Sequence, residues 1–370
     1  MKALTMMAAA ALAAATPARD DAAALREAQA AVRAEPDDAH ARVVLGLELL
    51  RAGRPDEAVT QLREAARGEP ESLELRLTLA QALGEAGLLE ESGRLYAGLV
   101  EAAPAALDVR VAYAGFLRKA QDPRGAIAQL QEALRLQPKD PELLFNLGEA
   151  LEAAGKTTDA IVTYREALAA DPKLTAARVN LGKALGELEQ NEAALGELSQ
   201  AAGESDDPEA HYNLGLVQWK LGSAQAAVAS YRKAIALAPK HAEAHNNLGI
   251  ALSEANDAEG ALAEFRQAVA LKPDYANAHF NLGLLYFKTG KDAQATAQFE
   301  RALQLRPESV QARLSLADAL LRQKQARRAL PLLKDVAQKR PRDPEAHRLL
   351  ARAYLETGDA DGGIAALERA

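Results

Sequence analysis

Asparagine recurs at one position of a repeating pattern in this sequence. The five residues, which we call the asparagine row, stand 33 or 34 residues apart: Asn146, Asn180, Asn213, Asn247 and Asn281. A primary amide offers two N–H donors and one carbonyl acceptor, so it can bind the backbone of an extended peptide whatever side chains that peptide carries. The row therefore predicts recognition of a polypeptide backbone. The alternative is that these amides form hydrogen bonds within or between repeats.

Aromatic and basic side chains stand beside the asparagine row. Steps of three and four residues return to the same side of a helix, and aromatic side chains on an exposed helix face anchor binding partners. We therefore add six residues to the candidate peptide-binding site: Tyr212, Trp219, Lys220, Phe280, Phe287 and Lys288. The alternative is that Trp219, Phe280 and Phe287 pack between adjacent repeats as core.

Other chemistry finds little support. Gly155-Lys156-Thr157 lacks the glycine of a phosphate-binding loop five residues earlier, where Ala150 stands, and the string is expected to be a turn between helices. His241 and His245 have the spacing of metal ligands on a helix, but no third ligand is evident. The chain has no cysteine, which removes disulfides and thiolate chemistry. We expect no cofactor, no metal and no catalytic group.

The elements that must position the asparagine row are pairs of helices. In the segment from Ala276 to Pro307, two apolar stripes at helical spacing are separated by Thr289-Gly290, which ends the first helix. The pattern returns every 34 residues, with prolines closing successive copies: Pro36, Pro70, Pro104, Pro138, Pro172, Pro239, Pro273, Pro307 and Pro341. Asp206 stands where one further proline is due, and one residue is missing near it. A single globular core would not impose this spacing.

The junction near Asp206 also carries helix-end signals. Gly203 is expected to end the helix before it. Ser205, Asp206 or Asp207 can accept from the free amides of the next helix, with Pro208 as its first residue.

Three small positions in each copy support the same register, because two helices approach closely only where neither carries a bulky side chain. One is the Gly of the recurring Leu-Gly pair, as in Gly283, which four copies replace with Ala. The second is small in all ten copies, as in Ala261 and Ala295, and the third is usually Ala, as in Ala302. Together these positions predict tandem helical hairpins.

A period of 34 residues with these small and large positions resembles the tetratricopeptide repeat (TPR) family. The resemblance covers Ala39 to Ala370 and implies an all-α fold, a right-handed α-solenoid, or superhelix, of tandem helix-turn-helix hairpins. The ten expected repeats are 39–72, 73–106, 107–140, 141–174, 175–207, 208–241, 242–275, 276–309, 310–343 and 344–370. Residues 19–38 are expected to form a half-repeat that caps the amino-terminal end. The fourth position departs from the family, since Arg or His usually replaces an aromatic residue there.

The resemblance also bears on function. In TPR arrays the stripe that holds the asparagine row lines the concave groove. The row is similar to the asparagine ladder in the TPR half of O-linked N-acetylglucosamine transferase, which grips a peptide backbone, although no catalytic half is present here. The paired Lys and Arg that clamp a terminal carboxylate in chaperone-binding TPR domains do not appear together, so that ligand is disfavoured.

Composition and the ends of the chain complete the prediction. A net charge of −8 and a pI near 5.5 argue against a nucleic-acid partner. Met1 to Ala18 resembles a secretory signal peptide cleaved after Ala15 or Ala18; the alternative is an alanine-rich start of a cytoplasmic protein. No other stretch approaches transmembrane length. Ile364 and Leu367 are expected either to let the C-terminal repeat self-associate or to lie on a sufficiently polar helix.

These observations predict a non-catalytic interaction scaffold that binds an extended polypeptide in its groove, in the periplasm or secreted. A protein or peptide is the expected ligand, and no integral membrane segment is expected after signal cleavage. Two alternatives stay open. One is a cytoplasmic scaffold with the same groove, and the other is the targeting or regulatory subunit of an enzyme whose catalytic part lies on another chain.

Overall fold

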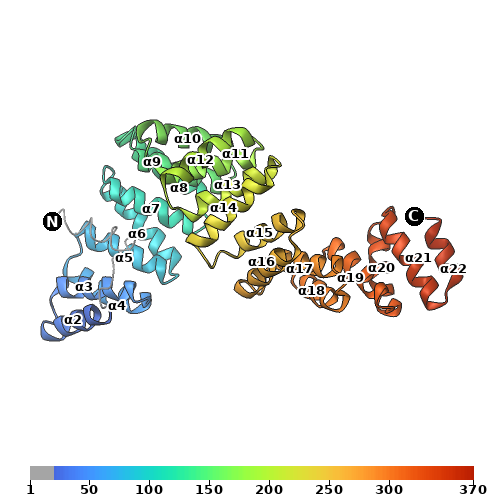
Figure 1. Cartoon of the computed structure of the whole chain (residues 1–370). Helices are drawn as coiled ribbons and strands as arrows, with labels where there is room; N and C mark the ends of the chain where they lie inside the picture. The colour runs from blue at the N-terminus through green and yellow to red at the C-terminus, as the bar shows by residue number, and fades with distance from the viewer. Residues whose placement is uncertain (1–20) are drawn as a thin grey trace. The chain divides into compact units, whose positions relative to one another are not determined.

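The computed structural model describes residues 21–370, and within this range all regular structure is helical (Figure 1). Helix α2 (Asp21–Ala34) comes first. The first helices of the repeats are α3 (Ala39–Arg51), α5 (Leu73–Glu85), α7 (Leu107–Lys119), α9 (Pro141–Ala153), α11 (Thr175–Glu187), α13 (Pro208–Lys220), α15 (Ala242–Glu254), α17 (Ala276–Lys288), α19 (Val310–Arg322) and α21 (Pro344–Thr357). The second helices are α4 (Pro55–Gly68), α6 (Leu89–Ala102), α8 (Pro123–Leu136), α10 (Thr157–Ala170), α12 (Asn191–Glu204), α14 (Ala224–Leu237), α16 (Ala258–Leu271), α18 (Asp292–Leu305), α20 (Ala326–Lys339) and α22 (Ala360–Leu367). The predicted all-α fold of tandem helical hairpins is confirmed.

The chain divides into two compact parts. The N-terminal part ends at Ala184 and the C-terminal part begins at Leu185. In each part a first helix packs against the second helix of its own repeat, and that second helix packs against the next first helix. None of the helices α2 to α22 has the length and apolar character needed to cross a bilayer. The segment Met1 to Ala18, with its predicted export signal, lies outside the described residues.

Local sequence signals set the helix ends. Asp140 precedes α9, and its carboxylate accepts a hydrogen bond of 2.9 Å from the amide of Leu143, an N-cap that satisfies an otherwise free N–H. Pro141 follows as the first helical residue, where its missing N–H costs nothing. Gly290 has φ of +74°, a left-handed conformation that favours glycine, directly after α17. These signals recur, so the hairpins repeat.

Glycine in the first helix lets an aromatic ring of the second helix lie against the backbone. A Cβ added at Gly283 would lie 2.7 Å from ring atoms of Phe299, which is fully buried. The same relation, sixteen residues apart, joins Gly249 to Phe265 and Gly215 to Tyr231. A contact of this length is a steric overlap, so the ring and any Cβ cannot share the space. The small residue is therefore required by the helix pairing itself.

The fourth position of the repeat, where the family often has an aromatic residue, holds a hydrogen-bond donor in every repeat except the fourth, which has Leu144. Its side chain reaches back six residues to the carbonyl of the closing proline, as when Arg110 Nε donates to Pro104 at 2.9 Å. The same bond joins Arg42 to Pro36, Arg178 to Pro172, His245 to Pro239, His279 to Pro273, Arg313 to Pro307 and His347 to Pro341. This contact fixes the turn between repeats by a hydrogen bond rather than by ring packing.

The junction near Asp206 differs from the others. Gly203 was predicted to end its helix, which is wrong: α12 continues through Glu204, and Gly203 has open space around its α-carbon. Asp207 caps α13 by accepting from the amide of Glu209 at 3.0 Å, and Pro208 is the first helical residue, as predicted. Helix α12 stops at Ser205, its C-cap, whose amide donates to the Ala201 carbonyl at 3.1 Å.

The last repeat is shorter than the others in its second helix. Helix α22 ends at Leu367, and Glu368 is its C-cap. Ile364 and Leu367 are more than half exposed, at 56% and 53%. Self-association through this repeat stays a prediction.

Candidate polypeptide-binding face

The asparagines of the C-terminal part join neighbouring first helices. Asn281 Nδ2 on α17 donates to Asn246 Oδ1 on α15 at 2.9 Å, and Asn246 Nδ2 donates to Asn247 Oδ1 at 3.0 Å. Asn247 Nδ2 then donates to the hydroxyl of Tyr212 on α13 at 3.2 Å. We call these four residues the amide chain. It crosses three consecutive first helices at the position of the asparagine row.

Asn246 belongs to the amide chain but is not among the predicted site residues. It is buried, with 3% of its surface exposed, whereas Asn247 and Asn281 are half-buried. The signal that points to it is the Asn246-Asn247 dipeptide, which occurs only in the seventh repeat. A buried amide needs partners because an unsatisfied one is costly, and here both neighbours supply them. The alternative, that the asparagines form hydrogen bonds within or between repeats, therefore accounts for part of the hydrogen bonding of the asparagine row.

The other three asparagines of the row are placed differently. Asn213 is half-buried and donates to the Glu209 carbonyl within its own helix at 2.9 Å. In the N-terminal part, Asn180 Nδ2 lies 3.5 Å from the Tyr164 hydroxyl, at the limit of a hydrogen bond. Asn146 is half-buried and makes no hydrogen bond to residues 21–370. The five amides therefore share a position but not a bonding pattern.

Acceptors and donors remain on this face after the internal bonds are counted. Within residues 21–370, neither Asn213 Oδ1 nor Asn281 Oδ1 receives a hydrogen bond. Tyr212 accepts from Asn247, which leaves its own O–H as a donor. Burial raises the pKa of Tyr212 to about 12, so that hydroxyl keeps its proton at neutral pH. The face thus presents both hydrogen-bond functions that a peptide backbone requires.

The predicted aromatic residues are half-buried. Tyr212, Trp219, Phe280 and Phe287 pack against the hydrophobic core of the C-terminal part. Phe280 lies 5.7 Å from the ring of Phe299, centroid to centroid, and Tyr212 lies 4.5 Å from the ring of His241. Both ring contacts lie within a single repeat, so they do not test the alternative of packing between repeats. The half-buried state leaves the remaining surface accessible.

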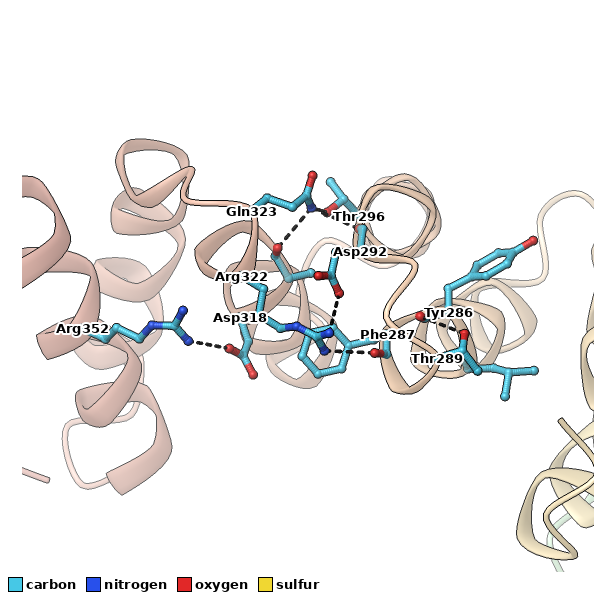
Figure 2. A network of polar contacts seen from close by, with 11 residues as sticks. Tyr286, Phe287, Thr289, Asp292, Thr296, Asp318, Arg322, Gln323 and Arg352 are labelled. Atoms are coloured by element: carbon cyan, nitrogen blue, oxygen red, sulfur yellow. Dashed lines mark hydrogen bonds and ion pairs between the residues drawn. The ribbon is translucent and has the colours of Figure 1, made fainter.

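Basic residues at the ends of first helices contact the preceding repeat. Lys220 Nζ donates to the Gly186 carbonyl at 2.7 Å, and Arg322 Nη1 donates to the Phe287 carbonyl at 3.0 Å (Figure 2). Both carbonyls lie in the last turn of a first helix, where the helix dipole favours a cation. Lys288, by contrast, is exposed and forms no ion pair within the described range.

Arg322 also covers part of a predicted site residue. Its guanidinium lies 4.3 Å from the centre of the Phe287 ring and 3.1 Å from Asp292 Oδ1. Figure 2 shows the arginine side chain extended beside that ring, with dashed lines to Asp292 and to the Phe287 carbonyl. The ring of Phe287 is therefore less available than that of Trp219, which has no such neighbour in the described structure. No pattern in the sequence indicated this cover.

The motifs that suggested other chemistry have structural roles. Gly155, with φ of +72°, and Lys156 form the turn between α9 and α10. His241 is the N-cap of α15, and its Nδ1 accepts from the Ala244 amide at 3.3 Å, while His245 points to Glu264 and Pro239. Within residues 21–370, no three histidine, aspartate or glutamate side chains gather as a metal site requires. The histidine pair is thus divided between two separate contacts.

The fold and its repeating contacts define a helical-repeat protein, and sequence comparison gives the family. Residues 43–106, 117–174 and 179–242, about half of the chain, match one tetratricopeptide repeat model, and residues 230–263 match another. The chain belongs to the tetratricopeptide repeat family. Residues 261–370 match a model described as the TPR domain of cytochrome c-type biogenesis protein H. No curated protein matches the sequence.

Solved structures share the fold. One is the Cut9–Hcn1 hetero-tetramer of APC/C, with 20% identity over 85% of this chain and 63% of that chain and a TM-score of 0.54. Another is the human IFIT1 dimer with m7Gppp-AAAA, with 19% identity over 93% of this chain and 84% of that chain and a TM-score of 0.50. MamA has 26% identity over 44% of this chain and 95% of its own, with a TM-score of 0.41. At their identities, the first two structures show a shared fold alone.

Proposed function

We propose that this chain is a non-catalytic scaffold that holds an extended polypeptide along the first helices α13, α15 and α17. Membership of the tetratricopeptide repeat family supports a protein-interaction role. The observation that carries the specific site is the amide chain, because it places amides of two successive repeats beside a tyrosine hydroxyl of a third, with Asn281 Oδ1 left as a free acceptor. A peptide backbone offers donors at regular intervals, and such a row receives them without reading side chains.

Aliphatic side chains on the same face supply the apolar part of the site. Leu216, Ile250 and Leu284 occupy one position, the ninth, in three consecutive repeats, and each is half-buried against the core of the C-terminal part. They lie three residues beyond the asparagine row, on the same side of each helix. Trp219 adds an aromatic surface at one end. The face therefore suits a polypeptide that alternates backbone contacts with apolar side chains.

The expected affinity is modest. Each hydrogen bond contributes about 1 kcal/mol net, so a few amide contacts give several kcal/mol, from which ordering of a flexible peptide removes a part. Burial of apolar side chains on Leu216, Ile250 and Leu284 adds roughly 25 cal/mol per Å². These terms support a dissociation constant of about micromolar order.

A more specific role follows from one comparison. Residues 261–370, from α16 to the last repeat, match the TPR domain of cytochrome c-type biogenesis protein H. We therefore propose that the polypeptide is one handled in cytochrome c-type biogenesis. The predicted export signal in Met1 to Ala18 supports a place outside the cytoplasm. Fusion of that segment to a reporter tests the location, and a reporter retained in the cytoplasm contradicts it.

The binding site is tested with substitutions in the row. A panel of unstructured, haem-free cytochrome c peptides labelled with a fluorophore is titrated with the full chain, and binding is followed by fluorescence polarisation. Replacing Asn213, Asn247 and Asn281 by Ala should weaken the tightest peptide about tenfold or more. Gln294→Ala, on the exposed side of α18, also removes a side-chain amide; it is the matched control and should leave binding unchanged.

Loss of folding must be separated from loss of binding. Helix content and the urea midpoint of each variant are measured beside the affinity, because Asn247→Ala also removes the bond to Tyr212. Equal affinity of the triple variant and the parent would show that the asparagines only connect the repeats. Binding of peptides unrelated to cytochrome c with the same affinity would support the scaffold but contradict the more specific role.

A further inference from the structure

In four repeats the position-four side chain has two partners, and the last repeat lacks the second of them. Besides the closing proline, the side chain meets a glutamine or glutamate nineteen residues later on the second helix. The pairs are Arg42 with Gln61, Arg110 with Gln129, His245 with Glu264 and His279 with Gln298. In the last repeat the corresponding residues are His347 and Ala366. The methyl group of Ala366 cannot replace an amide or a carboxylate.

His347 is consequently left with one unsatisfied nitrogen in a buried place. Only 3% of its surface is exposed. Its Nε2 lies 2.9 Å from the Pro341 carbonyl, which only accepts, so Nε2 carries a hydrogen. Its Nδ1 has no hydrogen-bond partner among the described residues. A buried polar atom without a hydrogen bond costs free energy, so a ligand that supplies a partner for this nitrogen would recover that cost.

A cavity of about 500 Å³ lies between α20, α21 and α22. His347 and Ala366 both line it, and α22 contributes mostly small residues such as Gly362 and Ala365. Two cations, Lys334 and Arg369, line it as well, and no acidic side chain among the described residues does. Lys334 Nζ lies 5.2 Å from the centre of the Tyr354 ring. The cavity thus combines a buried histidine nitrogen with a positive rim.

The positive charge continues beyond this cavity. A second cavity, of about 440 Å³, shares Pro341 with the first and is lined by Arg340, Arg342 and Asp343. Asp343 is engaged as the N-cap of α21, where its carboxylate accepts from the Ala346 amide at 3.1 Å. Neither Arg340 nor Arg342 forms an ion pair in the described part of the chain. The carboxylate of Asp343 is therefore engaged in capping α21, while Arg340 and Arg342 are exposed to solvent.

We propose that the cavity at His347 binds a carboxylate group, which takes the place that Glu264 occupies beside His245. In that repeat the carboxylate lies 2.6 Å from the histidine Nδ1, which shows the geometry that the ligand would reproduce. With a carboxylate at Nδ1 and a carbonyl at Nε2, the imidazole of His347 carries two protons. Lys334 and Arg369 supply further charge-assisted hydrogen bonds. The assignment is independent of the polypeptide-binding face.

Two sources offer this chemistry, a small organic acid and an acidic side chain of a polypeptide. Glutarate reproduces the end of a glutamate side chain and is the first probe. A Gly-Ser peptide with one central glutamate is the second, and its glutamine counterpart and glutaramide are the neutral controls. Each is titrated into the full chain by calorimetry, and the imidazole ¹⁵N resonances of His347 are followed by NMR. Both acids should move those resonances, and the neutral controls should bind about tenfold more weakly.

Ala366→Gln is the decisive variant. It gives the last repeat the glutamine that repeats one, three and eight have at this position, so His347 gains a partner from its own chain. We expect it to keep the fold, to fill the cavity and to abolish binding of glutarate. Arg369→Gln should weaken binding about fivefold. Ala263→Gln, on the exposed side of α16, is the matched control and should leave binding intact. These substitutions avoid His347 itself, whose loss could unfold the last repeat.

Some outcomes distinguish the two sources of the carboxylate, and others overturn the proposal. Binding of glutarate that Ala366→Gln removes supports a small acid, and binding of the glutamate peptide alone supports a polypeptide side chain. Equal binding of glutaramide, or glutarate binding that Ala366→Gln leaves unchanged, overturns the proposal. So does the absence of any movement of the His347 resonances with both acids.

Discussion

His245 Nδ1 and Glu264 Oε2 lie 2.6 Å apart and join the first helix of the seventh repeat to its second. The other ring nitrogen lies 3.1 Å from the Pro239 carbonyl. A carboxylate and a carbonyl only accept hydrogen bonds, so the ring must hold a proton on each nitrogen. The bond to Glu264 raises the pKa of His245 above its ordinary value of 6.5, against the opposing effect of burial. The charged pair is therefore a pH-dependent link between helices.

The first prediction concerns this dependence. A group whose pKa is raised in the folded state contributes stability that is complete below its unfolded pKa and is lost as pH rises through the folded value. The free energy of unfolding should therefore fall as pH rises from about 6.5. Glu264→Gln should reduce that fall, and Gln298→Glu should add a second one at His279. Urea unfolding at pH 6 and pH 9 measures both, and equal pH slopes in all three proteins would contradict it.

The second prediction compares two histidines at the same position of neighbouring repeats. His279 uses both ring nitrogens, at 2.8 Å from Gln298 and 3.2 Å from Pro273. His211 Nε2 is buried without a partner, at the junction where the repeat is one residue shorter. His279→Leu should cost about 1 kcal/mol or more, and His211→Leu should be close to neutral. Urea midpoints decide, and a larger loss for His211→Leu would refute the argument.

The sign of the pH effect at His211 is the reverse of that at His245. Burial lowers the pKa of His211, so its folded-state pKa lies below 6.5. When folding lowers a histidine pKa, the stability contribution is complete above the unfolded-state pKa. It is lost as pH falls from there through the folded-state pKa. His211→Leu should therefore reduce the loss of stability between pH 7 and pH 5. NMR titration of the His211 ring measures the pKa, and a value above 6.5 would rule out this sign.

The third prediction tests the glycine that admits an aromatic ring. Gly283→Ala places a Cβ about where ring atoms of Phe299 lie, so the ring must move within a full core. Overpacking costs roughly 1–3 kcal/mol, more than the gain of about 1 kcal/mol in helix propensity. Gly196→Ala in α12 is the matched control, since nothing lies within 4 Å of its added Cβ, and it should stabilise. A stabilised Gly283→Ala variant would contradict the packing argument.

The fourth prediction concerns Arg322, which joins α19 to the preceding repeat. Its guanidinium meets the Phe287 carbonyl, the Phe287 ring and Asp292 (Figure 2). Arg322→Ala should lower the free energy of unfolding by about 1 kcal/mol, and Arg322→Lys should restore only part, because an ammonium cannot make the forked contact. The same variants should expose more of the Phe287 ring, which ¹³C-labelled Phe resonances measure. Full restoration by lysine would show that charge alone matters here.

Much of the fold could be predicted because it depends on local chemistry repeated along the chain. Gly290 ends α17, Asp207 caps α13 and Pro208 begins it, and each signal acts within a few residues. The spacing of Gly283 and Phe299 follows from the geometry of a hairpin of fixed length. The prediction for Gly203 was wrong because a glycine can also lie inside a helix; α12 runs past it, and Ser205 is the C-cap.

The candidate site could be predicted in part. The position of the asparagine row was readable because one helix face repeats, but the bonds of Asn281 and Asn247 were not. Their partners, Asn246 and Tyr212, each lie 35 residues away in sequence, in the neighbouring repeat. Which amide turns toward which neighbour depends on how two first helices pack. No pattern within a single repeat contains that information.

The sequence by itself determined the family of this protein, the ends of its helices and the face that carries the amides. Those features follow from residue type and spacing, since helix periodicity and capping act over short distances. Tertiary structure alone decided that Asn246 is buried between Asn247 and Asn281, that Arg322 covers Phe287, and that His347 faces a cavity. Each is a relation between repeats or between helices. Such relations depend on packing distances, which spacing along the chain does not record.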